Sequence, residues 1–103
     1  MLITYKITET FPAVEKFRLV TQMNGSVISI TSNISEGFGR RGIKDKIRFY
    51  DMAVGSLFEF QNQLIIARDL TYISQKKFAE IYELSIDVLR LINALISSIN
   101  FSS

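Results

Sequence analysis

The sequence predicts an all-α fold, an antiparallel up-down four-helix bundle with a shortened first helix. Three observations support this class. Long segments place apolar residues three and four positions apart, which is the spacing of an amphipathic helix. Glycine, proline or a capping serine separates the segments by only about two to six residues, so neighbouring helices run antiparallel. The composition is that of one globular domain, residues 1–103, with 48% hydrophobic and 21% charged residues.

The first expected helix is a short apolar strip that precedes the single proline of the chain. Proline disfavours a helical conformation in the residue before it and suits a new helix start just after it. We therefore expect this short helix to stop at residues 10–12, which read TFP. The apolar residues of the strip are Leu2, Ile3, Tyr5 and Ile7.

The second expected helix spans about residues 15–36. Within it, residues 26–31 alternate β-branched and polar side chains, as a strand would. The flanking residues keep the helical spacing and no second strand candidate exists to pair with this one, so we expect helix with a weak point at Gly25. Three glycines in residues 37–42 then break the helix. The apolar face comprises Phe17, Val20, Met23, Val27, Ile30 and Ile34.

The third and fourth expected helices show the clearest periodicity, over about residues 43–70 and from Ser74 onward. Each has a second apolar strip beside the first, and the wide apolar face of the helix over residues 43–70 indicates that other helices pack on two of its sides. Ser74 is a good N-cap because its hydroxyl can accept a bond from a first-turn amide. The third helix carries Ile47, Tyr50, Val54, Leu57, Gln61 and Leu64, with Phe58 and Ile65 beside them. The fourth carries Phe78, Ile81, Ser85, Val88, Ile92, Leu95 and Ile99, with Tyr82, Leu89 and Ile96 beside them.

The composition excludes several kinds of chemistry. The chain has no Cys, His or Trp, which rules out disulfides, thiol nucleophiles, Cys/His zinc sites and catalysis by histidine. The first residues lack the pattern of a secretion signal, and no apolar run approaches the ~20 residues that cross a bilayer. We therefore expect a cytoplasmic protein that does not enter a membrane.

The basic residues are concentrated in one place. The segment 40–48 holds five bases and one acid, a net charge of +4, whereas the other 94 residues hold seven bases and nine acids. Such a compact patch is typical of contact with a phosphate backbone, although a merely solubilising loop has the same composition. Cations at a helix N-terminus also oppose the helix dipole, at a small cost that a bound polyanion would offset. The basic turn, as we name this set, comprises Arg40, Arg41, Lys44, Lys46 and Arg48.

No catalytic residue, metal ligand or cofactor-binding residue is predicted, and we expect a non-enzymatic protein. Residues 37–42 fit the spacing GxGxxG, but the dinucleotide-binding fingerprint needs a preceding strand, and here a helix is expected. Carboxylates are the remaining acid/base candidates, and di-metal bundle sites pair such groups with histidine, which is absent. We expect structural roles for them, with Glu36 accepting a bond either from Arg40 or Arg41 or from amides at the start of the next helix. The candidates are Glu36, Asp51, Glu59 and Asp69.

Residues 32–40 read SNISEGFGR, which resembles the SNIAEGFGR signature of the four-helix bundle proteins encoded in 23S rRNA intervening sequences. Residues 48–59 resemble the family's RFL-IA-GSL-E stretch, and residues 63–72 resemble its QL-IA-LGY stretch. Upstream, residues 11–22 match its FP-EE-(F/Y)-L-Q segment. At the level of motifs, the resemblance covers about residues 11–73.

The resemblance implies an all-α antiparallel bundle that assembles into a ring-shaped homopentamer, without enzymatic activity or a cofactor. It also implies a role with nucleic acid. A related branch of the family provides the accessory protein of diversity-generating retroelements, in which a basic pentamer partners a reverse transcriptase and its RNA.

The chain departs from the family pattern at three places. Residues 23–26 read MNGS where the family carries two arginines and small residues, so two basic groups are missing. Thr31 replaces a proline, which softens an expected kink. Before Tyr5 the first helix is roughly two turns shorter than in the family, whether by truncation or as a short helix. We expect this to leave an apolar groove that a neighbouring subunit can cover.

Two functions follow as hypotheses. The leading one is an oligomer that binds RNA or other nucleic acid non-specifically through the basic turn, repeated by symmetry. Phe38 and Phe49 lie among these bases, and we expect both to be core anchors rather than stacking platforms, so sequence-specific readout is not predicted. The alternative is a protein-interaction scaffold or an accessory subunit, for example of a reverse transcriptase. The low net charge of +2 and the missing arginines favour it.

Overall fold

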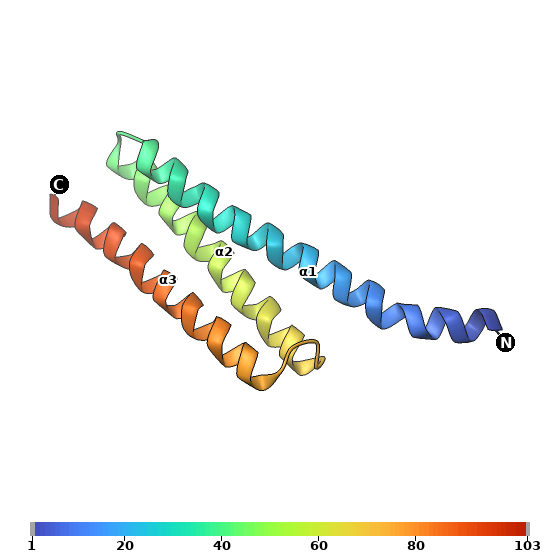
Figure 1. Ribbon diagram of the computed structural model, residues 1–103. Coiled ribbons are helices and arrows are strands. Elements are labelled where there is room, and N and C mark those ends of the chain that lie inside the picture. The colour runs from blue at the N-terminus through green and yellow to red at the C-terminus, as the bar shows by residue number, and fades with distance from the viewer. Residues whose placement is uncertain (1, 103) are drawn as a thin grey trace.

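The computed structural model describes the backbone of residues 2–102 and the side chains of residues 13–99. In this part of the chain there are three helices and no strand: α1 (Leu2–Gly39), α2 (Ile43–Asp69) and α3 (Gln75–Ser102). Helix α2 runs antiparallel to α1 and α3, which therefore point the same way (Figure 1). The molecule is long and flat, with principal extents of 67 × 25 × 13 Å.

The all-α class is confirmed, but the expected four helices are three in the described chain. The predicted stop at residues 10–12 is wrong, because α1 continues through Pro12 as one 38-residue helix. An interior proline removes one backbone hydrogen bond and costs about 3 kcal/mol. No glycine, asparagine or aspartate flanks Pro12 to form a turn, so the helix persists on both sides. The side chains of the expected first strip lie outside the described residues.

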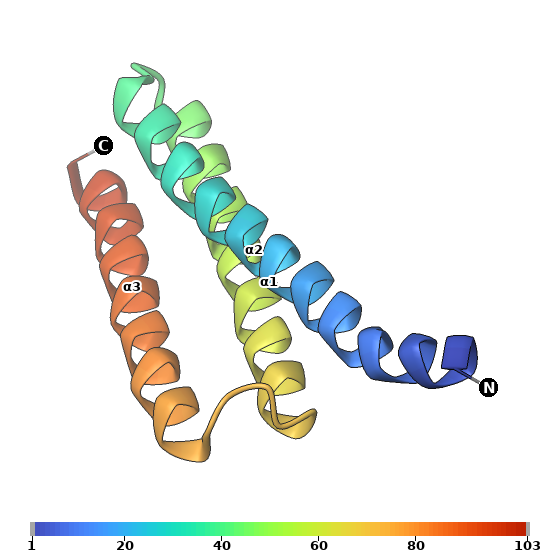
Figure 2. The same ribbon diagram turned by 45° about the vertical axis from the view of Figure 1, so that its right-hand side comes forward.

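Helix α1 extends beyond the hairpin that α2 and α3 form (Figure 2). The β-branched run at residues 26–31 lies within it, as predicted, and Gly25 does not interrupt it. The helix ends at Gly39, three residues later than expected. None of the described glycines has a positive φ, so the glycines of this break are not there to provide left-handed backbone.

Helix α2 is the centre of the fold because α1 and α3 both pack against it. The prediction that other helices pack on two sides of this helix is therefore confirmed. Tyr50, Leu57 and Leu64 of the expected stripe are buried, and Ile47 and Val54 are half-buried. The two residues of the second predicted strip differ in burial: Phe58 faces solvent, whereas Ile65 is half-buried. The buried core cluster consists of Ile30, Tyr50, Ala53, Leu57 and Ile92.

Helix α3 begins with the predicted cap. The Ser74 hydroxyl accepts a hydrogen bond from the Lys77 amide at 3.1 Å, and the Ser74 carbonyl accepts one from the Phe78 amide at 2.9 Å. Phe78, Ser85 and Ile92 of the predicted stripe are buried against α2. The remaining residues of both predicted strips are half-buried.

Polar side chains also join the helices. Ser26 of α1 donates to Gln63 of α2 at 3.0 Å, and Gln61 of α2 donates to Ser85 of α3 at 2.9 Å. All four of these side chains are buried. No buried side-chain nitrogen or oxygen in the described part lacks a partner. Because an unpaired buried polar group costs about 1–3 kcal/mol, these bonds favour one register between neighbouring helices.

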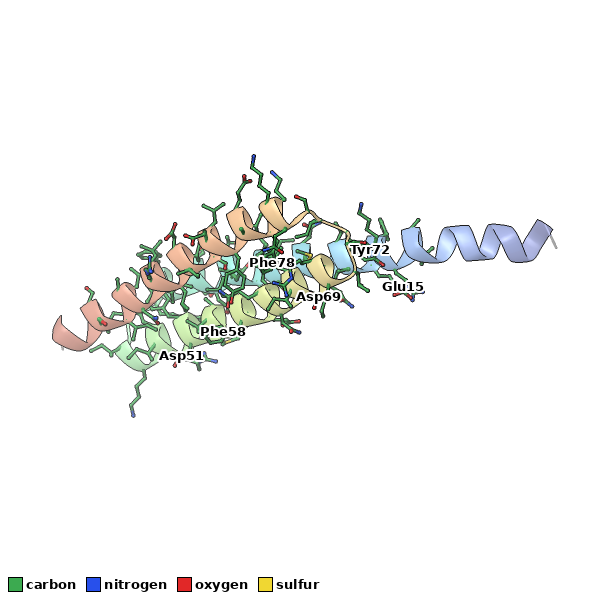
Figure 3. The ribbon with its side chains drawn as sticks, turned by 90° about the horizontal axis from the view of Figure 1, so that it is seen from below. Glu15, Asp51, Phe58, Asp69, Tyr72 and Phe78 are labelled. Carbon is green, nitrogen blue, oxygen red and sulfur yellow. The ribbon has the colours of Figure 1, made fainter. Side chains whose placement is uncertain are left out.

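Helices α1 and α3 pack mainly against α2 rather than against each other. Seen from below, Tyr72 of the α2–α3 turn lies near Glu15 of α1, and no other helix accompanies α1 before Glu15 (Figure 3). One face of the molecule is therefore open between α1 and α3.

Candidate nucleic-acid interface

The basic turn lies where α1 ends and α2 begins. Arg40 and Arg41 belong to the connection, and Lys44, Lys46 and Arg48 lie in the first two turns of α2. The Arg40 amide donates to the Gly37 carbonyl at 3.3 Å. Gly42 is the N-cap of α2 with extended backbone and no side-chain cap. The structure thus brings all five predicted bases to one end of the molecule.

Lys46 has a structural role that the sequence did not indicate. Its ammonium donates to the carbonyl oxygens of Gly37 at 3.0 Å and Phe38 at 3.1 Å, and its side chain is half-buried. These carbonyls belong to the last turn of α1, where the negative end of the helix dipole favours a cation. The unfavourable interaction expected between the Lys46 charge and the N-terminal end of the α2 dipole is therefore offset by the bonds of Lys46 to the end of α1.

Arg40 and Arg48 share one aromatic neighbour. Each guanidinium carbon lies 4.7 Å from the centroid of the Phe49 ring, a cation–π geometry. Arg40 also donates to Glu36 at 3.0 Å, as predicted for this carboxylate, and Arg48 lies 3.7 Å from Asp45. Both ion pairs are exposed, and such pairs contribute about 0–1 kcal/mol. The two guanidiniums are therefore positioned but remain available to an anion.

Arg41 and Lys44 are exposed, and neither has an ion pair or a side-chain hydrogen bond with the described residues. Their charged groups face water at the tip of the molecule. They are therefore the two bases that can contact a ligand without giving up an internal bond.

Beside the basic turn, the end of α1 packs on α2 through contacts of Gly37 and Phe38 with the Tyr50 ring. A Cβ at Gly37 would lie 2.8 Å from Cδ1 of the Tyr50 ring, so only glycine fits there without a shift. The Phe38 ring meets the Tyr50 ring edge-on at a centroid distance of 6.1 Å. Tyr50 is only 2% exposed, and this burial raises the pKa of its hydroxyl above the ordinary value.

The expectation that both phenylalanines are core anchors is wrong for Phe38, which is 61% exposed. The reason is that Tyr50 already fills the space under the end of α1, so Phe38 covers only the edge of that ring. Phe49 is half-buried, beneath two guanidiniums. The only signal of this contact in the sequence was that Arg48 directly precedes Phe49.

The carboxylates do not form a shared site. Glu36 binds Arg40, and Asp69 accepts a bond from Arg68 at 3.1 Å. Asp51 and Glu59 are exposed on α2, and Asp51 and Asp69 lie far apart along that helix (Figure 3). Among the residues the structure describes, no group of three or more acidic side chains could hold a metal ion.

Two further sequence patterns can be placed. The GxGxxG match begins in the last turns of α1, so a helix and not a strand precedes it, and the context of a dinucleotide-binding loop is missing. No described helix is both long and apolar enough to cross a bilayer.

Comparison with known proteins agrees with the motifs of the chain. No curated protein and no solved structure matches it. A sequence model of one family, described as 23S rRNA-intervening sequence protein, matches residues 1–94, nearly the whole chain. The chain therefore belongs to the 23S rRNA-intervening sequence protein family.

Proposed function

We propose that the chain is a non-enzymatic, homo-oligomeric protein that binds the phosphates of RNA or other nucleic acid without reading their sequence. The observation that carries this proposal is the exposed basic turn. Four of its bases are free or held in weak exposed pairs, and the fifth, Lys46, holds the turn in place by binding the end of α1.

The geometry favours phosphate over base recognition. Exposed ion pairs can exchange their carboxylate for a phosphate at little cost, because each contributes about 0–1 kcal/mol. Arg40 and Arg48 already lie over Phe49, so its ring is not free to stack on a base. Phosphate contacts fix position but carry no sequence information. Binding should therefore depend on charge and tolerate any sequence.

Assembly of several copies would multiply these contacts. One copy offers about four bases, and each phosphate neutralised contributes about −0.9 to the log–log salt slope on duplex DNA. A single copy is then expected to bind weakly, with a slope near −3 to −4. Each further copy on the same nucleic acid would add a similar increment to the slope.

The test is a binding titration of structured RNA and duplex DNA with a charge-reversed variant, Arg41→Glu with Lys44→Glu. Both side chains are exposed, and Lys46 is left intact so that the turn keeps its shape. The control is Lys76→Glu with Lys77→Glu, an equal change of charge at the start of α3, at the opposite end of α2. We expect the first variant to lose binding at least tenfold more than the control. Equal losses would contradict the proposal.

A second function is favoured by a different observation. Several large apolar side chains are exposed on α1 and α3, and they include Phe17, Leu84 and Leu91. Such surfaces suit a protein-interaction scaffold or an accessory subunit, for example of a reverse transcriptase. A chain that binds a reverse transcriptase in the absence of RNA, and that binds no nucleic acid by itself, would support this function instead.

A further inference from the structure

One aromatic ring beside the basic turn is exposed. Phe38 lies in the last turn of α1, at the end of the molecule where α1 connects to α2 (Figure 1), and is 61% exposed. Single exposed apolar side chains are common on protein surfaces, so exposure alone assigns no role to this ring. Three further properties of the Phe38 ring do: it is held in position, a ligand can reach it, and cations lie close to it.

Tyr50 holds the Phe38 ring in position. The two ring centroids lie 6.1 Å apart and the ring planes meet at 77°, the edge-to-face geometry that aromatic pairs prefer. Tyr50 itself is 2% exposed and belongs to the buried core cluster. A ring that is already fixed against the core loses little conformational freedom when a ligand binds, which favours binding.

Little of the chain shields the Phe38 ring from solvent. Both sequence neighbours of Phe38 are glycines, which have no side chain to cover it. A Cβ at Gly39 or Gly42 would meet nothing within 4 Å, so the space beside the connection is open. Among the described residues, no cation lies over the Phe38 ring, whereas two guanidiniums lie over Phe49. A planar ligand can therefore reach the ring of Phe38 but not that of Phe49.

The nearest cation is the ammonium of Lys46. It lies 3.1 Å from the carbonyl oxygen of Phe38 and 3.0 Å from that of Gly37. An ammonium has three donor hydrogens, and these two carbonyls use two of them. One donor remains for a phosphate oxygen of a nucleotide whose base lies on Phe38.

Two arginines lie close to the ring along the chain. Arg40 and Arg41 follow Phe38 by two and three residues, so their Cα atoms lie within about 7 and 11 Å of the Phe38 Cα. Stacked nucleotides of one strand rise about 3.4 Å each, so one to three nucleotides span these distances. The two acids of this region, Glu36 and Asp45, are each paired with an arginine. The ring therefore lies in a locally positive surface.

We propose that Phe38 is a stacking platform for an unpaired base of single-stranded RNA or DNA, whose neighbouring phosphates contact the basic turn. Proteins that bind single strands combine a basic surface with such aromatic rings, and they tolerate any sequence because every base has a π face. The inference rests on the proposed function and narrows its ligand class to strands with unpaired bases.

A duplex gains nothing from this ring unless its bases separate. The bases of a duplex are paired and stacked on one another, and unstacking them costs free energy. Duplex binding then depends on phosphate contacts with the basic turn alone. Single-strand binding depends on both the basic turn and Phe38, so the two ligands distinguish the role of the ring from that of the charges.

The first test compares Phe38→Ala with Phe58→Ala. Phe58 is 52% exposed on α2, and residues 54–62 around it carry no base. The probes are a single-stranded oligonucleotide of about 12 nucleotides, as RNA and as DNA, and the same strands annealed to their complements. We expect Phe38→Ala to weaken binding of both single strands about 5- to 150-fold, the range for loss of one stacked base, and to leave duplex binding unchanged. Phe58→Ala should change neither. Equal losses on single strands and duplexes, or no loss on single strands, would overturn the proposal.

The second test detects the stacked base directly. The chain has no tryptophan, so Phe38→Trp places a single fluorophore at the platform and keeps an aromatic ring there. This variant should bind single strands as tightly as the unaltered chain, and the stacked base should quench its fluorescence. Phe58→Trp is the control, and its fluorescence should not change. Unchanged emission of Phe38→Trp at saturating single strand would overturn the proposal, including the case in which another copy of the chain already covers this residue.

Failure of this inference and failure of the proposed function give different results. If Arg41→Glu with Lys44→Glu abolishes binding while Phe38→Ala has no effect, the basic turn binds phosphates and only the stacking is refuted. If the unaltered chain binds neither single strands nor duplexes at low salt, the proposed function is refuted, and the stacking with it.

Discussion

The close approach of Gly37 to Tyr50 predicts that Gly37→Ala destabilises the protein. A methyl group at this position would lie 2.8 Å from Cδ1 and 3.0 Å from Cζ of the Tyr50 ring, closer than carbon atoms pack. The ring is only 2% exposed, so it cannot move aside into water. Either the end of α1 or the α2 backbone must shift to admit the methyl group.

The magnitude follows from two opposing effects. Overpacking of this kind costs about 1–3 kcal/mol. Alanine in place of a helical glycine recovers about 0.5–1 kcal/mol. The expected net loss therefore lies within about 0–2.5 kcal/mol and is centred near 1 kcal/mol, which corresponds to roughly 4–8 °C in melting temperature for a chain of this size.

Gly25→Ala and Gly55→Ala are matched controls. Both glycines lie inside helices, and a Cβ at either would meet nothing within 4 Å. These variants should be more stable than the unaltered chain by about 0.5–1 kcal/mol. The assay is urea unfolding followed by far-ultraviolet circular dichroism at one protein concentration, because assembly makes stability depend on concentration. If Gly37→Ala were stabilised as much as the controls, the account of this contact would be refuted.

Three further predictions concern stability. Thr71 has a φ of 59°, which is strained for a β-branched residue, so Thr71→Gly should stabilise the protein by about 1 kcal/mol in the same urea assay. Ser85→Ala leaves the buried Gln61 amide without its partner and should cost about 1–3 kcal/mol. Gln61→Leu in addition should restore most of that loss. Because burial raises the pKa of Tyr50, the unfolded chain ionises first as pH rises past about 10. Stability should then fall with rising pH, and the fall should be smaller in Tyr50→Phe; equal falls would argue against the burial effect.

Much of the fold follows from local sequence patterns. The three long helices, the helical state of the β-branched run at residues 26–31 and the Ser74 cap were all predictable, because each depends on spacing or on one capping bond. The position at which α1 ends was not predictable in this way. Glycine was expected to break the helix near Gly37, whereas its role there is to admit the Tyr50 ring, a contact between residues 13 positions apart.

The continuation of α1 through Pro12 was not predicted. Proline alone was expected to stop the helix, but no turn-forming residue lies beside it to support a stop. The helix therefore continues, and the chain has three helices in its described part where four were expected.

The location of the basic turn was predictable from composition, but the roles of its members were not. Five bases within nine residues are necessarily close in space. That Lys46 binds the end of α1, while Arg41 and Lys44 face water, depends on how α1 and α2 meet. The exposed Leu84 and Leu91 were also missed, because the expected strips on this helix followed its buried faces.

The most direct test of the central claim, that the basic turn binds phosphates, is the salt dependence of binding to duplex DNA. The slope of log K against log salt is measured for the unaltered chain, for Arg41→Gln with Lys44→Gln, and for Lys76→Gln with Lys77→Gln. Loss of two phosphate contacts per copy should make the slope of the first variant shallower by about 1.8 per bound copy, and the control should not change it. Identical slopes for all three proteins would contradict the claim.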